Sequence, residues 1–197
     1  MSDYGGIMKA AFTALFALLL SFSAQADIHD DFQALKNVRK DYQAIGTICE
    51  EVARLQLSRL YQAPYYKVVT GIEYGNSGRT IGELDVIVFE SRTGEAIKVA
   101  EVKCWKDMGA GLSKARKQRQ RFIQALRSSQ RLYFWSSATH EQFDRDQFDS
   151  IQEFASIAQK GATHYGYDDE LEYSLSELMT LRAMLMECQD RGECAHP

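Results

Sequence analysis

Residues 82–105 read GELDVIVFESRTGEAIKVAEVKCW, two apolar runs separated by the turn-forming sequence SRTG. Runs rich in β-branched and aromatic residues on either side of such a turn predict an antiparallel hairpin. Each run nevertheless contains charge: Asp85 lies in the first, and Glu101 and Lys103 lie in the second. Charged side chains inside a strand cost free energy unless they are paired or bind a ligand. These three residues therefore need a chemical explanation.

The predicted hairpin brings the charged residues together. If SRTG forms the turn, Asp85 and Glu101 lie opposite each other, with Cβ atoms about 4.5–5.5 Å apart. Strand alternation then places Lys103 on the same face. Two converging carboxylates repel each other unless a cation lies between them. Mg²⁺ is the expected ion because it takes carboxylate oxygens and keeps waters for substrate exchange; Mn²⁺ is a further candidate. The alternative is a structural ion network on the face of the sheet.

The sequence on either side of the hairpin predicts the fold class. Ile45, Ile48, Val52 and Leu55 recur at helical spacing, and three strand-like segments follow them before the next helical stretch. Three consecutive strands between helices predict an α/β fold, a mixed sheet flanked by helices with appended C-terminal helices. The expected helices cover about residues 44–60, 112–127, 141–159 and 174–187, and the expected strands cover 65–69, 81–90, 96–105 and 131–136.

GELDVIV followed by VAEVK resembles the core motif of the PD-(D/E)XK nuclease superfamily, in the form found in Holliday-junction resolvase-like nucleases. The resemblance covers about residues 44–137. The expected order of helix, three strands, helix and strand is also the common core of that family, the restriction-endonuclease-like core. The resemblance implies that Asp85 and Glu101 bind the metal together with the Val102 backbone carbonyl. It also implies that Lys103 assists the attacking water in hydrolysis of a phosphodiester bond.

Many members of this family also place a glutamate from the first helix at the active site. Two adjacent residues, Glu50 and Glu51, are candidates for this position. On a helical wheel, Glu51 lies at the edge of the apolar face and Glu50 points away from it. The wheel therefore favours Glu51 as the fourth catalytic side chain. The alternative for either residue is an ordinary solvated charge.

The expected helix over residues 112–127 reads LSKARKQRQRFIQALR and is dense in positive charge. Helices at this position in the resembled family often contact the nucleic-acid backbone, which makes Lys114, Lys117, Gln118 and Arg121 candidate nucleic-acid-binding residues. Such phosphate contacts give salt-sensitive, sequence-independent affinity. The alternative is a solvated helix face. Three aromatic residues are interpreted as base-stacking or core side chains: Trp105, Tyr133 and Trp135.

The net charge of −4 excludes a wholly basic nucleic-acid coat protein, but the charge is unevenly distributed. Residues 1–140 contain 19 Lys and Arg against 14 Asp and Glu, whereas residues 141–197 contain 4 against 13. This asymmetry predicts a basic working surface and an acidic remainder.

The N-terminal residues predict export. From Met8 the chain reads MKAAFTALFALLLSFSAQAD: a lysine, a short apolar run, and the small-x-small triplet Ala24-Gln25-Ala26 typical of a secretory signal. The apolar run is shorter than the approximately 20 residues of a membrane span. A buried N-terminal helix is the alternative. We expect a periplasmic or secreted protein with no membrane anchor after cleavage.

The predicted segments are a signal peptide at 1–26 (with Met8 as an alternative start), a lead-in at 27–43, a nuclease core at 44–137 and a helical extension at 138–197.

Export changes how the four cysteines are interpreted, because an even number in an oxidising compartment favours disulfides. Cys188 and Cys194 are close enough in sequence to join the C-terminal tail to itself, which leaves Cys49 to pair with Cys104. Two buried free thiols in place of the second bridge are the alternative.

Together these features predict an exported Mg²⁺-dependent nuclease that acts on DNA in preference to RNA. Two alternatives remain open. One is a nucleic-acid-binding module that keeps the fold without the chemistry. The other is an envelope protein-interaction domain in which the charges of the sheet are structural.

Overall fold

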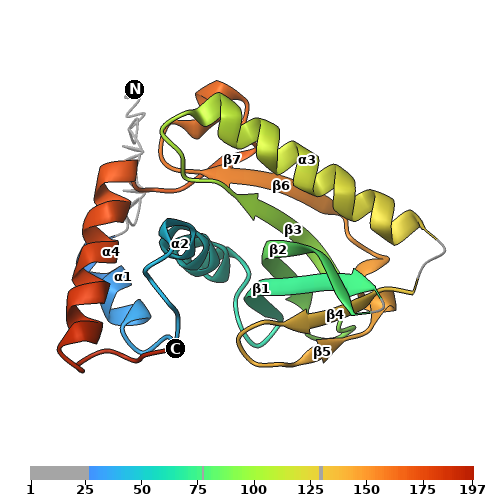
Figure 1. Ribbon diagram of the computed structural model, residues 1–197, viewed down its shortest axis with the longest axis horizontal. Coiled ribbons are helices and arrows are strands. Elements are labelled where there is room, and N and C mark those ends of the chain that lie inside the picture. The colour runs from blue at the N-terminus through green and yellow to red at the C-terminus, as the bar shows by residue number, and fades with distance from the viewer. Residues whose placement is uncertain (1–26, 77, 129–130) are drawn as a thin grey trace, which may run out of the picture.

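The computed structural model describes residues 27–76, 78–128 and 131–197; the predicted signal peptide lies outside the described residues. They form an α/β fold with a seven-stranded mixed sheet flanked by helices (Figure 1). None of the helices in these ranges is long and apolar enough to cross a lipid bilayer. The elements are α1 (Ile28–Leu35), α2 (Ile45–Leu60), β1 (Tyr66–Asn76), β2 (Arg79–Glu90), β3 (Ala96–Val102), α3 (Met108–Arg127), β4 (Tyr133–Ser136), β5 (Gln142–Phe143), η1 (Arg145–Phe148), β6 (Glu153–Ala158), η2 (Ala162–Tyr165), β7 (Asp169–Glu170) and α4 (Leu175–Asp190).

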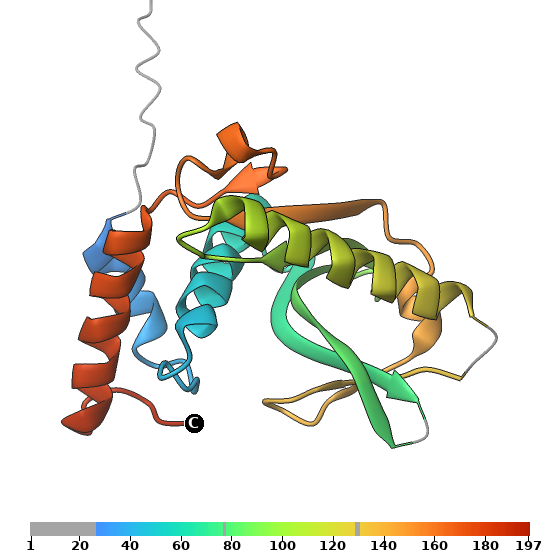
Figure 2. The same ribbon diagram turned by 45° about the horizontal axis from the view of Figure 1, so that its top comes forward.

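The strand order in the sheet is β5-β4-β1-β2-β3-β6-β7. Strands β1, β2 and β3 form an antiparallel meander, and β4 and β5 extend it antiparallel at the β1 edge. At the other edge β6 pairs with β3, and β7 with β6, both in parallel. Parallel neighbours need a crossover connection, and between β3 and β6 the chain passes through α3, then through β4 and β5 at the other edge of the sheet, and through η1. Figure 2 shows how strongly β1 and β2 bend as they leave the centre of the sheet.

The hairpin of β2 and β3 has the register expected from the SRTG turn. Val86 lies opposite Ala100, and Val88 lies opposite Lys98. One step further along this register come Asp85 on β2 and Glu101 on β3. A one-residue slip would send every side chain of a strand to the other face of the sheet. The observed register therefore places these two carboxyl groups together.

Each face of the sheet has its own hydrophobic core. Helix α2 packs on one face, with α1 and α4 side by side beyond it (Figures 1 and 2). Its buried residues Ile48 and Val52 belong to a cluster with Val86 of β2. Helix α3 covers the other face and buries Phe122 against a cluster that includes Ile87. Burying each of these large apolar side chains contributes about 1.5–3 kcal/mol relative to exposure.

Helix α3 begins one turn earlier than the sequence pattern suggests. The Asp107 side chain accepts a hydrogen bond from the Ala110 N–H at 2.9 Å and so satisfies a free donor of the first turn. Two glycines, Gly109 and Gly111, lie in this first turn, and glycine weakens the helical pattern there. At one of them, Gly111, an added Cβ would lie 2.5 Å from the Tyr167 hydroxyl. The glycine thus allows Tyr167 to pack closely against the first turn of α3.

The predicted helix over about residues 141–159 is wrong. This segment forms β5, η1 and β6, and only α4 is a helix of the expected C-terminal pair. The stretch EFASIA of β6 is mostly buried, because it lies between β3 and β7 within the sheet. A short apolar run buried on both faces has no alternation, so periodicity cannot distinguish it from a helix. The C-terminal third of the chain therefore contributes strands to the same sheet.

Both disulfides of the pairing scheme expected from the sequence are present, rather than one bridge and two free thiols. Cys188 at the end of α4 is bonded to Cys194, and Cys49 of α2 is bonded to Cys104, which follows β3. Disulfides of this kind are typical of proteins that fold in an oxidising compartment. The second bridge fastens α2 to the edge of the hairpin that carries the charged residues.

Candidate active site

Three buried charged side chains from β2 and the end of β3 meet on one face of the hairpin. Asp85, Glu101 and Lys103 are 5%, 3% and 8% exposed. The Lys103 Nζ atom lies 2.5 Å from Asp85 Oδ2 and 3.5 Å from Glu101 Oε2. Asp85, Glu101 and Lys103 therefore lie on the same face of the hairpin, as strand alternation predicts.

The backbone of Val102 completes this group. Its N–H donates a hydrogen bond to Asp85 Oδ2 at 2.7 Å, and its carbonyl oxygen accepts one from Lys103 Nζ at 3.0 Å. Three oxygens, from two carboxyl groups and one carbonyl, thus surround a single cationic nitrogen. These are the same three groups that the resemblance assigns to a metal ion. These three oxygens therefore stabilise a positive charge at the position that the Lys103 ammonium group occupies.

The electrostatics show that one ammonium group does not keep both carboxyl groups ionised at neutral pH. Burial, and then the charge of Asp85, raises the pKa of Glu101 to about 8. Burial lowers the pKa of Lys103, but the carboxylates of Asp85 and Glu101 outweigh it and the net shift is upward. In addition, the Glu101 Oε2 atom is buried and accepts no hydrogen bond. The cluster would bind additional positive charge favourably.

Glu51, favoured from the helical wheel, lies in a different set of contacts. Its carboxylate is 1% exposed, accepts a hydrogen bond from the Thr70 hydroxyl at 2.7 Å and pairs with Arg54 Nε at 2.6 Å. Lys40 Nζ lies 3.6 Å away. The wheel correctly indicated that Glu51 faces inward. However, Glu51 faces β1 and not the charged cluster, and the neighbouring Arg54 and Lys40 balance its charge.

Glu50 lies on the side of α2 that faces the site. It lines a cavity together with Val102 and Lys103. Burial raises the pKa of Glu50 to about 8, and the nearby charges of Asp85 and Glu83 add to the shift. Because Cys49 is bonded to Cys104, the position before Glu50 is tied to the position after Lys103. The structure therefore brings Glu50, rather than Glu51, to the charged cluster.

Gly71 of β1 lies next to the charged cluster, and the sequence analysis did not identify it as part of the site. In the β1–β2 register it lies between the pairs Thr70–Val86 and Ile72–Leu84, and so across from Asp85. Its φ of 70° lies in the left-handed region, which glycine adopts without strain. An added Cβ would lie 3.3 Å from Glu83 Oε1 and 3.7 Å from Lys40 Nζ. The available signal was an isolated glycine inside a strand, which often marks a close approach to the backbone.

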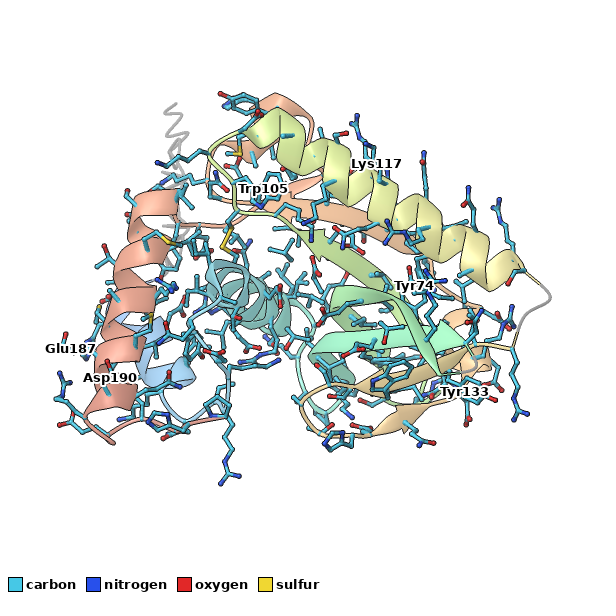
Figure 3. The ribbon with its side chains drawn as sticks, in the orientation of Figure 1. Tyr74, Trp105, Lys117, Tyr133, Glu187 and Asp190 are labelled. Atoms are coloured by element: carbon cyan, nitrogen blue, oxygen red, sulfur yellow. A yellow bond between two sulfur atoms is a disulfide. The ribbon has the colours of Figure 1, made fainter. Side chains whose placement is uncertain are left out.

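The candidate nucleic-acid-binding residues lie on α3. Lys114, Lys117 and Arg121 are exposed, and Lys117 is seen on the middle of the helix in Figure 3. Gln118 is half-buried, and its side-chain oxygen is buried without a hydrogen-bond partner. These positions follow the i, i+3, i+4, i+7 repeat and so lie along one side of the helix. Arg119, by contrast, faces β6 and donates to the Phe154 carbonyl at 3.0 Å.

A second lysine with two carboxylates provides a comparison on the same strand. Lys98 of β3 is buried and pairs with Glu153 at 2.8 Å and with Asp169 at 3.1 Å. Both of these carboxylates are about half exposed. Solvent therefore stabilises their charge, and Lys98 pairs with each in an ordinary ion pair. The cluster around Lys103 differs because all of its members are buried.

Within the described ranges, no group of three or more His, Cys, Asp or Glu side chains is arranged to hold a metal ion. The cluster around Lys103 consists of two carboxyl groups and a backbone carbonyl, which is a smaller set. Comparisons of the chain with protein-family models, with curated proteins and with solved structures find no match.

Proposed function

We propose that this protein is an exported metal-dependent nuclease that hydrolyses phosphodiester bonds in DNA, with RNA as a less favoured substrate. The observation that carries the proposal is the convergence of Asp85, Glu101 and the Val102 carbonyl on one buried positive charge. A purely structural ion pair needs only one carboxylate beside Lys103, and burying a second carboxyl group there is costly unless a further cation pairs with it.

The donor set fits a hard divalent cation. Carboxylate and carbonyl oxygens are the ligands that Mg²⁺ prefers, and Mn²⁺ accepts the same set. The Glu101 Oε2 atom is buried and makes only a long ion-pair contact with Lys103 Nζ, at 3.5 Å, so it can still accept an ion as a ligand. Asp85, Glu101 and the Val102 carbonyl would hold the cation, with waters and a phosphate oxygen as further ligands. When bound, the cation would polarise the phosphodiester and lower the pKa of a water molecule.

The remaining roles follow from side-chain chemistry. Lys103 has a flexible four-carbon stem, so its ammonium group can move while the strand remains fixed. Beside a bound phosphodiester, the Lys103 ammonium group would stabilise the negative charge that develops on the phosphate and orient the attacking water. Glu50 supplies a third carboxyl group in the cavity wall, where it would position water or cation.

Three further features support the proposal. The order α2, β1, β2, β3, α3, β4 agrees with the restriction-endonuclease-like core of the resembled PD-(D/E)XK family. The exposed cations of α3 would bind the phosphate backbone without sequence preference. The two disulfides favour an oxidising compartment, periplasmic or extracellular, over the cytoplasm.

The test is incubation of the protein, with both disulfides formed, with linear, circular and single-stranded DNA and with RNA. Each substrate is combined with Mg²⁺, Mn²⁺ or EDTA, and a Lys103→Ala variant serves as the control. We expect cutting that requires a divalent cation and is lost in the variant.

The other outcomes distinguish the alternatives. Salt-sensitive binding of DNA without cutting under any metal would support a binding module that lacks the chemistry. Neither cutting nor binding would contradict the proposal and direct attention to a protein partner.

A further inference from the structure

A cavity of about 530 Å³ adjoins the charged cluster, with which it shares Glu50, Val102 and Lys103. This volume is within the usual range of small-molecule sites. Its other walls come from the first turn of α2, the segment between β3 and α3, and the first turns of α4. Any group that occupied it would lie directly beside a phosphate held by Lys103.

Trp105 forms one wall of this cavity and is 40% exposed. Its position is held from both sides. The preceding residue, Cys104, is bonded to Cys49, and the Trp105 carbonyl accepts a hydrogen bond from Gln159 Nε2 at 2.7 Å. Figure 3 shows Trp105 in the segment that joins β3 to α3. An aromatic ring on a fixed backbone is a preorganised surface for stacking, since little freedom is lost on binding.

The chemical character of the cavity matches a nucleotide. Three lysines, Lys103, Lys106 and Lys114, line it against the single acid Glu50. Lys114 Nζ lies 5.0 Å from the centre of the Trp105 ring. Apolar side chains also line the cavity, among them Ile45, Leu175 and Met179. The lining therefore combines cations for phosphate with an aromatic and apolar surface for a base.

We infer that this cavity binds a nucleobase next to the cleaved phosphodiester, stacked on Trp105, and that the preferred substrate is single-stranded. This inference rests on the proposed function. In a duplex both faces of each base are covered by its neighbours, whereas an unpaired base is free to stack on an aromatic side chain. Stacking of this kind tolerates any base, in keeping with the sequence-independent contacts of α3.

The test uses tryptophan fluorescence, because the chain contains only two tryptophans. A Trp135→Phe variant leaves Trp105 as the reporter, and a Trp105→Phe variant leaves Trp135, which lies on β4 away from the cavity. Each is titrated in EDTA with a short oligothymidylate and with a blunt-ended duplex of equal length. Anisotropy of a labelled oligonucleotide measures binding independently.

We expect the single strand to quench Trp105 emission to saturation and to leave Trp135 unchanged, with a weaker effect from the duplex. Trp105→Ala should weaken single-strand binding roughly 5- to 150-fold, while Trp105→Phe should keep most of it. Binding without quenching of Trp105, equal quenching by duplex, or unchanged affinity in Trp105→Ala would overturn the inference. If the wild type cuts DNA in Mg²⁺, such a result refutes the base pocket alone. A wild type that neither binds nor cuts refutes the proposed function as well.

Discussion

Replacing Glu50 and Glu51 of α2 one at a time tests which of the two carboxyl groups belongs to the active site and which stabilises the fold. Glu50 and Glu51 are adjacent, and each is replaced by glutamine, which keeps the shape and removes the charge. The structure predicts opposite results for the two variants. Glu50→Gln should lose activity and keep stability, whereas Glu51→Gln should lose stability and keep activity per folded molecule.

The size of each effect follows from the contacts. Removing one partner of a buried ion pair costs about 3–5 kcal/mol. Arg54 and Lys40 are about one-fifth exposed and regain some hydration, and glutamine still accepts from Thr70, so we expect about 2–3 kcal/mol for Glu51→Gln. In a domain of this size that lowers the melting temperature by roughly 4–12 °C. Because burial raises the pKa of Glu50 to about 8, it is largely neutral at pH 7, and glutamine should change stability by less than about 1 kcal/mol.

Thermal unfolding in EDTA measures the stability of both variants, and the rate of Mg²⁺-dependent cutting of single-stranded DNA measures their activity. We expect Glu50→Gln to cut on the order of 10- to 100-fold more slowly, as for groups that support a metal site. The reasoning is refuted if Glu51→Gln abolishes cutting at an unchanged melting temperature while Glu50→Gln cuts like the wild type.

Three further predictions concern pH, the disulfide and the basic helix. Because the folded chain raises the pKa of Glu50 and of Glu101 from 4.5 to about 8, it binds more protons than the unfolded chain between these values. The unfolding free energy of the metal-free protein should therefore fall as pH rises across this window, and denaturant titrations should show a shallower fall in Glu101→Gln. Replacing Cys49 and Cys104 by serine opens a cross-link over 55 residues and should cost about 4 kcal/mol by the chain-entropy model, with loss of cutting; the short C-terminal bridge should cost only about 2 kcal/mol and leave cutting intact. Lys117→Ala should weaken DNA binding equally for all sequences. In titrations at several salt concentrations, it should reduce the slope of log affinity against log salt concentration by about one.

The central hairpin could be predicted from the sequence because its determinants are local. The SRTG turn and the apolar runs on either side set the register, and the register alone brings Asp85 opposite Glu101. Alternation along β3 then places Lys103 on the same face. The disulfide between Cys49 and Cys104 was one of two open possibilities, since elimination cannot exclude free thiols.

Other features depended on tertiary contacts that a local pattern does not contain. The stretch EFASIA of β6 is a strand because two parallel neighbours cover its edges. Glu51 is buried as the wheel indicated, but the wheel could not show that Thr70 and Arg54 would surround it. Glu50 lies beside Lys103 because a disulfide joins the preceding residue, Cys49 of α2, to Cys104 after β3. Its role depends on packing between distant segments.

The most direct test is whether the buried cluster binds a divalent cation at all. Mn²⁺ is titrated by calorimetry into the metal-free, oxidised protein, into Asp85→Asn, and into Asp169→Asn from the half-exposed cluster around Lys98. The account predicts binding with proton release in the wild type and in Asp169→Asn, because Glu101, whose pKa burial raises to about 8, must ionise to bind metal. It predicts at least a tenfold loss of affinity in Asp85→Asn. Absence of binding in the wild type, or equal affinity in all three proteins, would show that Asp85, Glu101 and Lys103 form a structural ion network.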